Sequence, residues 1–355
     1  MKLLHITATH LSLAGGIPVV LRDLVEAQNN IEDFEARVLS VKASTSEMKS
    51  TFFDTLSETS FEEYINRYLP DVVIFHSHYY FEYLNLYKLL LKKNIPYFIE
   101  PHGSFGKAAL QKSKYKKLIA NKVILRMFMR RAKGYIFLNE SEKKDAQFHT
   151  NNDIIIPNGI VEREIKPLCA DNKECSFYFI GRYDINHKGL DYLFDALDIL
   201  ENKGVSIIFN LYGKGNESEE QYINSRISKY KAVQIKNCGA IYGEAQSKEL
   251  EQCGIMVLTS RYEGFPMTVL EAWKYGNPCL VTPGTNVYKE VASNGLGWAV
   301  ELSVQHIADM IVKAQNDYNL NKKQYIIACK NYVKNNYSWK SLAKLSFDAL
   351  SIIVN

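Results

Sequence analysis

The sequence predicts an α/β protein made of two doubly wound, Rossmann-like parallel sheets. Short apolar runs rich in Ile, Val, Phe and Tyr alternate with helix-length segments over most of the 355 residues. Strands that read as continuous apolar runs are typical of a parallel sheet covered by helices on both faces. The alternation restarts after residue 160, and a chain of this length exceeds the size at which single cores usually stop growing.

The first half contains six strand-like runs, several of which end in Gly, His, Asn or Ser. They are KLLHIT (2–7), RVLSV (37–41), DVVIFHSH (71–78), PYFIEPHG (96–103), GYIFLN (134–139) and DIIIPNG (153–159). Helical patterns lie between them, for example PVVLRDLVEAQNN (18–30) and YYFEYLNLYKLLLKKN (79–94). We therefore expect a first domain over residues 1–160.

The second half repeats the pattern with five further runs. They are CSFYFIGRY (175–183), SIIFNLYGKG (206–215), VQIKNCGA (233–240), GIMVLTS (254–260) and PCLVTPG (278–284). Helical patterns then continue from about residue 303 to the end. We expect a second domain over 161–335 and a last helix, 336–355, that crosses back to the first domain. Ligands of such sheets collect at the carboxyl ends of the strands, which predicts a site in a cleft between the two domains.

Composition favours a cytoplasmic globular protein, with 46% hydrophobic and 23% charged residues. No run of about 18 apolar residues is present, and MKLLHITATH reads straight into a strand rather than a signal peptide. The six cysteines form no CxxC pair, which favours buried thiols over disulfides or a metal site.

The net charge of +4 comes from the first half, where residues 1–159 hold 21 Lys and Arg against 17 Asp and Glu. Within it, residues 107–133 contain ten basic residues and no acid, interleaved with apolar ones. Such a segment either lies on an anionic membrane surface, peripherally at the inner face of the cell membrane, or forms a core helix with a solvated basic face. Nucleic acid is not expected as a partner, because no binding motif accompanies the charge.

Two carboxylates stand eight positions apart in SRYEGFPMTVLEAWKYGNP (260–278). Glu263 follows a predicted strand, Gly264 permits a tight turn, and Pro266 suits the first position of a helix that contains Glu271. Carboxylates accept hydrogen bonds from vicinal hydroxyls of a sugar or ribose, and a helix N-terminus attracts anions. Glu271 lies too deep in the helix merely to complement its dipole, and among apolar neighbours it needs a partner.

Two cations bracket the turn in IGRYDINHKGLDYL (180–193). Arg182 follows Gly181 at the end of a predicted strand, and Lys188 precedes the helix that starts near Gly189. Together they could hold a diphosphate and stabilise its departure without a metal. The alternative is a surface Arg and a surface Lys without a shared role.

Three further features in the first half are weaker candidates: a glycine pair, a single histidine and a histidine pair. Gly15 and Gly16 follow the first strand and allow close approach of a ligand to the backbone, although the pattern is no GxGxxG fingerprint. His102 stands at a strand end in IEPHGSFG. His76 and His78 alternate onto one face of a strand and could hold a metal, but no third ligand is in view, so no metal site is expected.

These motifs resemble the retaining, Leloir-type glycosyltransferases of family 4, which have the GT-B fold. The matching features are Glu263-x7-Glu271, Arg182 with Lys188-Gly189, Gly15-Gly16, PHG (101–103) and PNG (157–159), in the family's order and over most of the chain. Two positions depart from the pattern: Asn139-Glu140 before Ser141, and TPGTNVYKEV (282–291), which lacks a second glycine.

The resemblance implies the role of each residue. Glu271 would bind the donor ribose, while Glu263 and the backbone of Gly264, Phe265 and Pro266 would hold the transferred sugar. Arg182 and Lys188, beside Gly181, would bind the diphosphate, with His102 near the sugar. Gly15 and Gly16 would lie close to the phosphates and the acceptor.

The resemblance also implies the reaction. The chain would be a hexosyltransferase (EC 2.4.1.-) with an acceptor-binding first domain and a nucleotide-sugar-binding second domain. Transfer would retain configuration without a metal or cofactor, with a UDP-sugar as the first choice of co-substrate and a GDP-sugar as the second. The expected acceptor is a saccharide, lipid-linked, in capsule, O-antigen or exopolysaccharide synthesis. Two alternatives stay open: a catalytically weak nucleotide-sugar-binding or assembly protein, and a sugar-nucleotide epimerase on the same scaffold.

Overall fold

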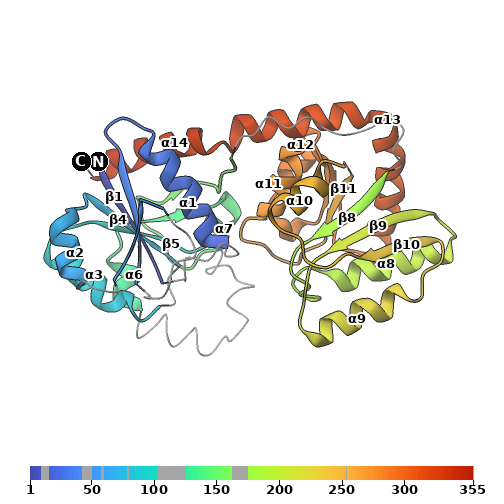
Figure 1. The fold of residues 1–355 in the computed structure, drawn as a ribbon, viewed down its shortest axis with the longest axis horizontal. Coiled ribbons are helices and arrows are strands. Elements are labelled where there is room, and N and C mark those ends of the chain that lie inside the picture. Colours follow the sequence, from blue (N-terminus) through green and yellow to red (C-terminus); the bar gives the residue numbers. More distant parts are fainter. Residues whose placement is uncertain are drawn as a thin grey trace. The chain divides into compact units, whose positions relative to one another are not determined.

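The structure is a computed structural model that describes residues 1–8, 16–41, 50–56, 60–77, 80–102, 125–161, 175–252 and 254–354. The chain divides into two compact units (Figure 1). The first unit comprises Met1–Val161 together with Tyr337–Asn355, and the second comprises Glu162–Asn336.

The first unit is built on a seven-stranded parallel sheet with the order β3-β2-β1-β4-β5-β6-β7. Its strands are β1 (Lys2–Thr7), β2 (Glu35–Ser40), β3 (Phe53–Thr55), β4 (Val72–His76), β5 (Tyr97–Glu100), β6 (Gly134–Phe137) and β7 (Ile154–Ile155). Every residue of β4, β5 and β6 is buried, as the continuous apolar runs predict for a sheet covered on both faces.

Helices cover both faces of this sheet. They are α1 (Gly16–Asn29), α2 (Phe61–Tyr68), α3 (Tyr83–Lys92), α6 (Arg126–Arg130), α7 (Glu140–Asp145) and α14 (Trp339–Val354). α2 starts where it does because Ser60 and Glu63 form a reciprocal capping box. α14 packs beside α1, where the rings of Phe34 and Phe347 lie 5.1 Å apart, so the last helix completes the first unit (Figure 1).

The second unit has a six-stranded parallel sheet with the order β10-β9-β8-β11-β12-β13. Its strands are β8 (Ser176–Ile180), β9 (Ile207–Tyr212), β10 (Val233–Asn237), β11 (Ile255–Leu258), β12 (Cys279–Val281) and β13 (Gly297–Ala299). Its helices are α8 (Leu190–Asn202), α9 (Glu217–Ile227), α10 (Gly243–Leu250), α11 (Met267–Lys274), the 3-10 turn η2 (Pro283–Thr285), α12 (Tyr288–Asn294) and α13 (Val304–Asn336), which is kinked at Asn321.

The predicted fold class, two doubly wound Rossmann-like units, is confirmed. In each sheet the strand order reverses once, between β1 and β4 in the first unit and between β8 and β11 in the second. Two strands of three residues each, β3 and β13, were not predicted, and both lie at the edge of their sheet. Pro266 is the cap before α11 rather than its first residue, a shift of one position.

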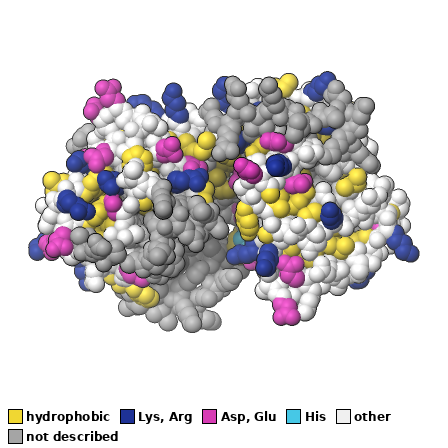
Figure 2. All heavy atoms as spheres, viewed as in Figure 1, with side chains coloured by type: hydrophobic (Ala, Val, Ile, Leu, Met, Phe, Trp, Pro, Cys, Tyr) yellow, Lys and Arg dark blue, Asp and Glu magenta, His cyan; other side chains and the backbone are white. Residues whose placement is uncertain are grey.

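Most of the predicted basic segment 107–133 lies outside the described residues. In the described part, α6 carries Arg126 and Arg130 outward, while Phe128 and Met129 are buried in the core of the first unit. The core-helix interpretation therefore holds for α6. Across the face shown in Figure 2, basic and acidic side chains are interspersed over the described surface of both units.

Among the described helices, none combines the length and apolarity needed to cross a bilayer.

Candidate functional site

Two loops of the second unit bring Lys188 and Glu263 together. They follow β8 and β11, the neighbouring strands at which the order of this sheet reverses, where ligands of doubly wound sheets collect. Lys188 Nζ lies 2.6 Å from Glu263 Oε1, and the two side chains are 15% and 9% exposed. Two residues that the sequence analysis placed on opposite sides of a ligand therefore form one largely desolvated ion pair.

The Glu263 loop is held by several side chains. Ser260 Oγ donates to Glu263 Oε1 at 2.5 Å, and His187 Nε2 lies 3.9 Å from Glu263 Oε2. The Asn286 side chain donates to the backbone carbonyl oxygens of Glu263 and Gly264. These contacts fix the turn that runs through Gly264 into α11.

Gly189 explains how Lys188 is positioned. It is the N-terminal cap of α8 and has a left-handed φ of 62°. A Cβ atom there would collide with the carbonyl oxygen of Thr259. The Thr259 hydroxyl donates to the carbonyl oxygens of Lys188 and Gly189, at 3.1 and 3.0 Å. A glycine is therefore required for the two loops to approach this closely.

Arg182 differs from Lys188 in its environment. Its side chain is 66% exposed, and its described ion pair is a 3.4 Å contact from Nη2 to Asp184 Oδ2. An exposed pair of this kind contributes little to stability, so the guanidinium can exchange Asp184 for an anionic ligand at low cost.

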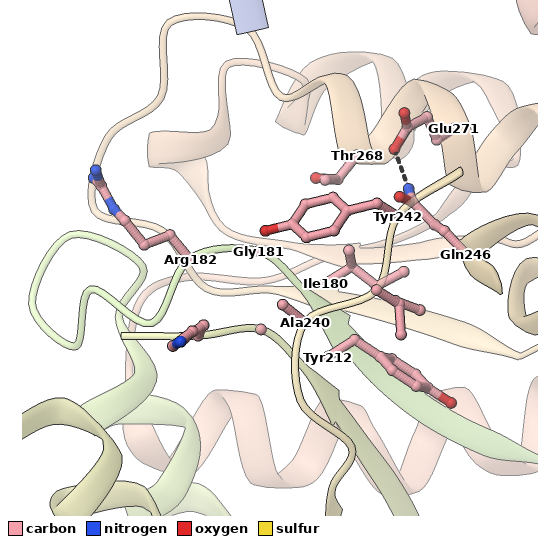
Figure 3. A pocket seen from close by; sticks show the side chains of 12 residues that line it. Ile180, Gly181, Arg182, Tyr212, Ala240, Tyr242, Gln246, Thr268 and Glu271 are labelled. Atoms are coloured by element: carbon pink, nitrogen blue, oxygen red, sulfur yellow. Dashed lines mark hydrogen bonds between the residues drawn. The ribbon is translucent and has the colours of Figure 1, made fainter. Parts of the chain in front are cut away.

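Beside this loop lies a cavity of about 310 Å³ within the second unit (Figure 3). It contains Gly181, Arg182 and Glu271 of the predicted set, whereas Lys188, Glu263, Gly264, Phe265 and Pro266 are not among its lining residues. The lining residues are Ile180, Gly181, Arg182, Tyr212, Gly213, Lys214, Ala240, Ile241, Tyr242, Gln246, Thr268 and Glu271. The cavity therefore extends from the end of β8 to the first turns of α11.

Glu271 has the partner that its surroundings require. Its Oε2 accepts a hydrogen bond of 2.6 Å from Gln246 Nε2 on α10 (Figure 3). Burial raises the pKa of Glu271, while the bond from Gln246 and the charge of Lys274 act in the opposite direction. Gln246 thus helps to keep an acceptor carboxylate at the cavity wall.

Sequence reasoning missed the residues that enter the cavity from the ends of β9 and β10. Lys214 follows Gly213 after β9, and Ile241 and Tyr242 follow β10; the Tyr242 side chain is 71% exposed. Figure 3 shows the Tyr242 ring across the cavity between Arg182 and Gln246. Their positions in the sequence were the available signal, because each lies at the end of a predicted strand: Lys214 after β9, which neighbours β8, and Ile241 and Tyr242 after β10, which neighbours β9.

In the first unit, the predicted Gly15 lies outside the described residues, as do His78 and Gly103. Gly16 opens α1, and His102 follows β5 with a left-handed φ of 50°. These two residues and the cavity belong to different units, so their predicted roles near the donor stay predictions.

His102 belongs to a buried chain of hydrogen-bonded side chains. Gln28 Oε1 lies 3.0 Å from His5 Nε2, and His5 Nδ1 lies 2.8 Å from His76 Nε2. His76 Nδ1 in turn lies 2.9 Å from His102 Nε2. Glu100 closes the cluster, with Oε2 at 3.3 Å from His76 Nδ1 and Oε1 at 3.5 Å from His102 Nδ1. Both ring nitrogens of His102 therefore face this cluster.

Burial controls ionisation in the chain. It lowers the pKa of His5 and of His102 to about 4 and that of His76 well below 6.5. Burial, with the nearby carboxyl of Glu142, raises the pKa of Glu100 to about 8. Burial thus favours the neutral form of each histidine and of the Glu100 carboxyl.

Residues 161–335 match the family described as Glycosyl transferases group 1. Among sequence relatives, the lipopolysaccharide 1,6-galactosyltransferase of Escherichia coli K12 is 29% identical over 121 residues, 32% of each protein. An uncharacterized glycosyltransferase of Methanocaldococcus jannaschii is 25% identical over 191 residues, 53% of this chain and 47% of that protein. The matches thus span about a third to a half of the length of these curated relatives.

Solved structures resemble the whole chain. Sucrose-phosphate synthase from Thermosynechococcus elongatus superposes with a TM-score of 0.76 at 15% identity, covering 99% of both chains. Anabaena HepE in complex with UDP and glucose has a TM-score of 0.72 at 14% identity, again covering 99% of both. At these identities the likeness concerns the fold, and it supports the GT-B architecture. Residues 161–335 thus match the group 1 glycosyl transferase family, and the structural likeness adds the fold of the whole chain.

Proposed function

We propose that the chain is a retaining glycosyltransferase that moves a sugar from a UDP-sugar to a saccharide acceptor without using a metal in the transfer step. The observation that carries the proposal is the cavity at the strand-order reversal of the second unit. It combines a carboxylate, Glu271, with two cations, Arg182 and Lys214, next to the Lys188–Glu263 pair. Its volume of about 310 Å³ falls at the lower end of the roughly 300–1,000 Å³ typical of small-molecule sites.

The chemistry of the wall matches the parts of a nucleotide sugar. Glu271, held by Gln246, can accept hydrogen bonds from the vicinal hydroxyls of a ribose. Tyr242 offers an exposed aromatic face to a base, and Arg182 and Lys214 offer donors to the diphosphate. UDP is the nucleotide named for the solved complexes of Anabaena HepE, which supports uridine as the first choice of base.

In the proposed step, the bond between the sugar C1 and the diphosphate oxygen breaks as the acceptor oxygen bonds to C1 on the same face. The departing phosphate oxygen takes the acceptor proton, so configuration is retained and no protein nucleophile is needed. Negative charge grows on the diphosphate, which Arg182 and Lys188 stabilise, while positive charge grows on the sugar, which Glu263 stabilises. The stabilisation is thus directed at the separated charges of the transition state.

The acceptor we propose is a lipid-linked saccharide of a surface polysaccharide. Support comes from the lipopolysaccharide galactosyltransferases among the relatives and from the basic composition of 107–133. A protein held peripherally at the inner face of the membrane by basic residues would meet such an acceptor there, at about 1 kcal/mol per basic residue near the surface.

The first experiment is thermal stabilisation by UDP, GDP and ADP and their sugar conjugates, each with and without EDTA. Saturation at about 100 times the dissociation constant should stabilise by ~2.7 kcal/mol. The expected result is a shift with UDP and UDP-sugars that EDTA leaves unchanged.

Two variants test whether the thermal shift comes from UDP bound in the cavity. Glu271→Gln replaces a charged acceptor by a neutral one and should weaken UDP binding by about 10- to 100-fold. Glu217→Gln, on the exposed start of α9, should bind like the parent. A response to no nucleotide at millimolar concentration would contradict the donor site and favour a binding or assembly role.

A further inference from the structure

The Gln28–His5–His76–His102–Glu100 chain in the first unit is not used by the proposed transfer. Gln28 lies on α1, His5 on β1, His76 on β4 and Glu100 at the end of β5, with His102 two residues further on. Four separate elements therefore bring five polar side chains together. The side chains of His76, Glu100 and His102 are 1%, 8% and 10% exposed. A buried polar cluster of this size requires a specific arrangement of protons or a bound cation.

Gln28 determines the direction of the chain. Its amide nitrogen donates to Ser346 Oγ, which itself donates to the carbonyl oxygen of Ala343. The Gln28 oxygen therefore faces His5 and accepts from His5 Nε2–H, which leaves His5 Nδ1 as an acceptor for His76 Nε2–H. The lone pair of His76 Nδ1 consequently points toward His102 and Glu100.

Three potential metal ligands meet at this lone pair. One ligand atom from each of His76, Glu100 and His102 lies within 4.8 Å of the others. The closest pairs are 2.9 Å between His76 Nδ1 and His102 Nε2, and 3.3 Å between His76 Nδ1 and Glu100 Oε2. Bonds of about 2.0–2.1 Å in a tetrahedral zinc site place neighbouring ligand atoms roughly 3.3 Å apart, so small side-chain movements suffice.

The ligand types fit a cation. Among the described residues, the ion-pair contacts of Glu100 are with His76 and His102. A divalent cation would bind the Glu100 carboxylate and one ring nitrogen of each histidine.

We propose that His76, Glu100 and His102 form a binding site for a divalent transition metal, Zn²⁺ by the nature of its ligands. Two imidazoles and one carboxylate are a known zinc ligand set, with one position left open. His5 and Gln28 orient His76 from behind, as hydrogen-bonded partners of metal-binding histidines commonly do. The site belongs to the first unit, whereas Arg182, Lys188, Glu263 and Glu271, which the proposed transfer uses, belong to the second.

The test measures metal binding by the full-length chain after chelator treatment and dialysis. Zn²⁺ is added back with a competing chelator, bound metal is quantified by mass spectrometry, and Co²⁺ serves as a coloured probe of the ligand geometry. The parent should bind one equivalent and show the intense visible absorption of low-symmetry Co²⁺.

Variants locate the ion. His76→Gln and Glu100→Gln should each weaken Zn²⁺ binding by at least about 100-fold, and His5→Gln by about 10- to 100-fold. His149→Gln changes an exposed histidine of the same unit and should bind like the parent. Circular dichroism identifies any variant that fails to fold, and the Co²⁺ spectrum of the parent then decides.

Binding of less than one equivalent by the parent, or equal affinity in the parent and all folded variants, would overturn the proposal. The chain would then be held by hydrogen bonds alone. Because the readouts are metal content and spectrum, failure here leaves UDP binding by the second unit as expected.

Discussion

Replacing Lys188 with methionine would leave the Glu263 carboxylate, only 9% exposed, without its partner at 2.6 Å. Breaking a buried ion pair by removing one partner costs ~3–5 kcal/mol, because an uncompensated charge stays buried. Ser260 and His187 remain beside the carboxylate, which favours the lower end, about 3 kcal/mol. For a unit of this size about 2–4 °C correspond to 1 kcal/mol, so Tm should fall by ~6–12 °C.

A double-mutant cycle separates the pair from its surroundings. Glu263→Gln alone should also destabilise, whereas the double variant K188M/E263Q should recover part of the loss, with a coupling energy of at least ~1 kcal/mol. The measurement is urea unfolding of the parent, the two single variants and the double variant. Lys344→Met serves as the control, because the side chains of its pair with Asp348 are 61% and 52% exposed and the loss should stay below ~1 kcal/mol.

Two results would refute this reasoning. If Lys188→Met were no more destabilising than Lys344→Met, the pair would not be desolvated as the structure has it. If the two single losses simply added in the double variant, Lys188 and Glu263 would not interact.

Three other predictions follow from the second unit. Gly189→Ala should lower the free energy of unfolding in urea by at least ~3 kcal/mol, because the added Cβ meets a carbonyl oxygen. Gly204→Ala, which has a φ of 65° but open space around it, should lower it by only about 1–2 kcal/mol. Equal losses would contradict the close approach of the loops. Gln246→Ala removes the hydrogen bond that lowers the pKa of Glu271, so UDP binding measured by calorimetry should weaken. The pH below which UDP binding is lost should also rise, and an unchanged pH profile of binding would argue against this role. Burial lowers the pKa of His187 below 6.5, so as the pH falls below 6.5 the unfolded chain binds this proton before the folded chain does, and stability decreases. The free energy of unfolding should therefore decrease less between about pH 7.5 and pH 5 in His187→Gln than in the parent. An identical decrease would refute the assignment.

The periodicity of the sequence was sufficient to predict the fold class. Continuous apolar runs such as 71–78 and 254–260 predicted strands, and the structure has β4 and β11 there. Local signals also placed Lys188 and Glu263 in loops after strands. The two strands that were missed, β3 (FDT) and β13 (GWA), contain no consecutive Ile, Leu or Val residues, unlike the equally short β12 (CLV).

Which side chains Lys188 and Glu271 contact could not be predicted from the sequence, because these contacts depend on the tertiary structure. Lys188 and Glu263 are 75 positions apart, and their ion pair exists because β8 and β11 are neighbours in the sheet although β9 and β10 separate them along the chain. Gln246 on α10 reaches Glu271 on α11 although 25 positions separate the two residues. No local pattern encodes a contact between segments so far apart.

Hydrophobic periodicity and turn residues act over a few positions, so most strands and helices, and the side chains at their ends, could be read from the sequence. The cavity that Glu271 shares with Tyr242 and Lys214, and the contact of His76 with Glu100 and His102, required the folded structure. Strand order brings these side chains together, and strand order results from burying every helix and strand in one core at once.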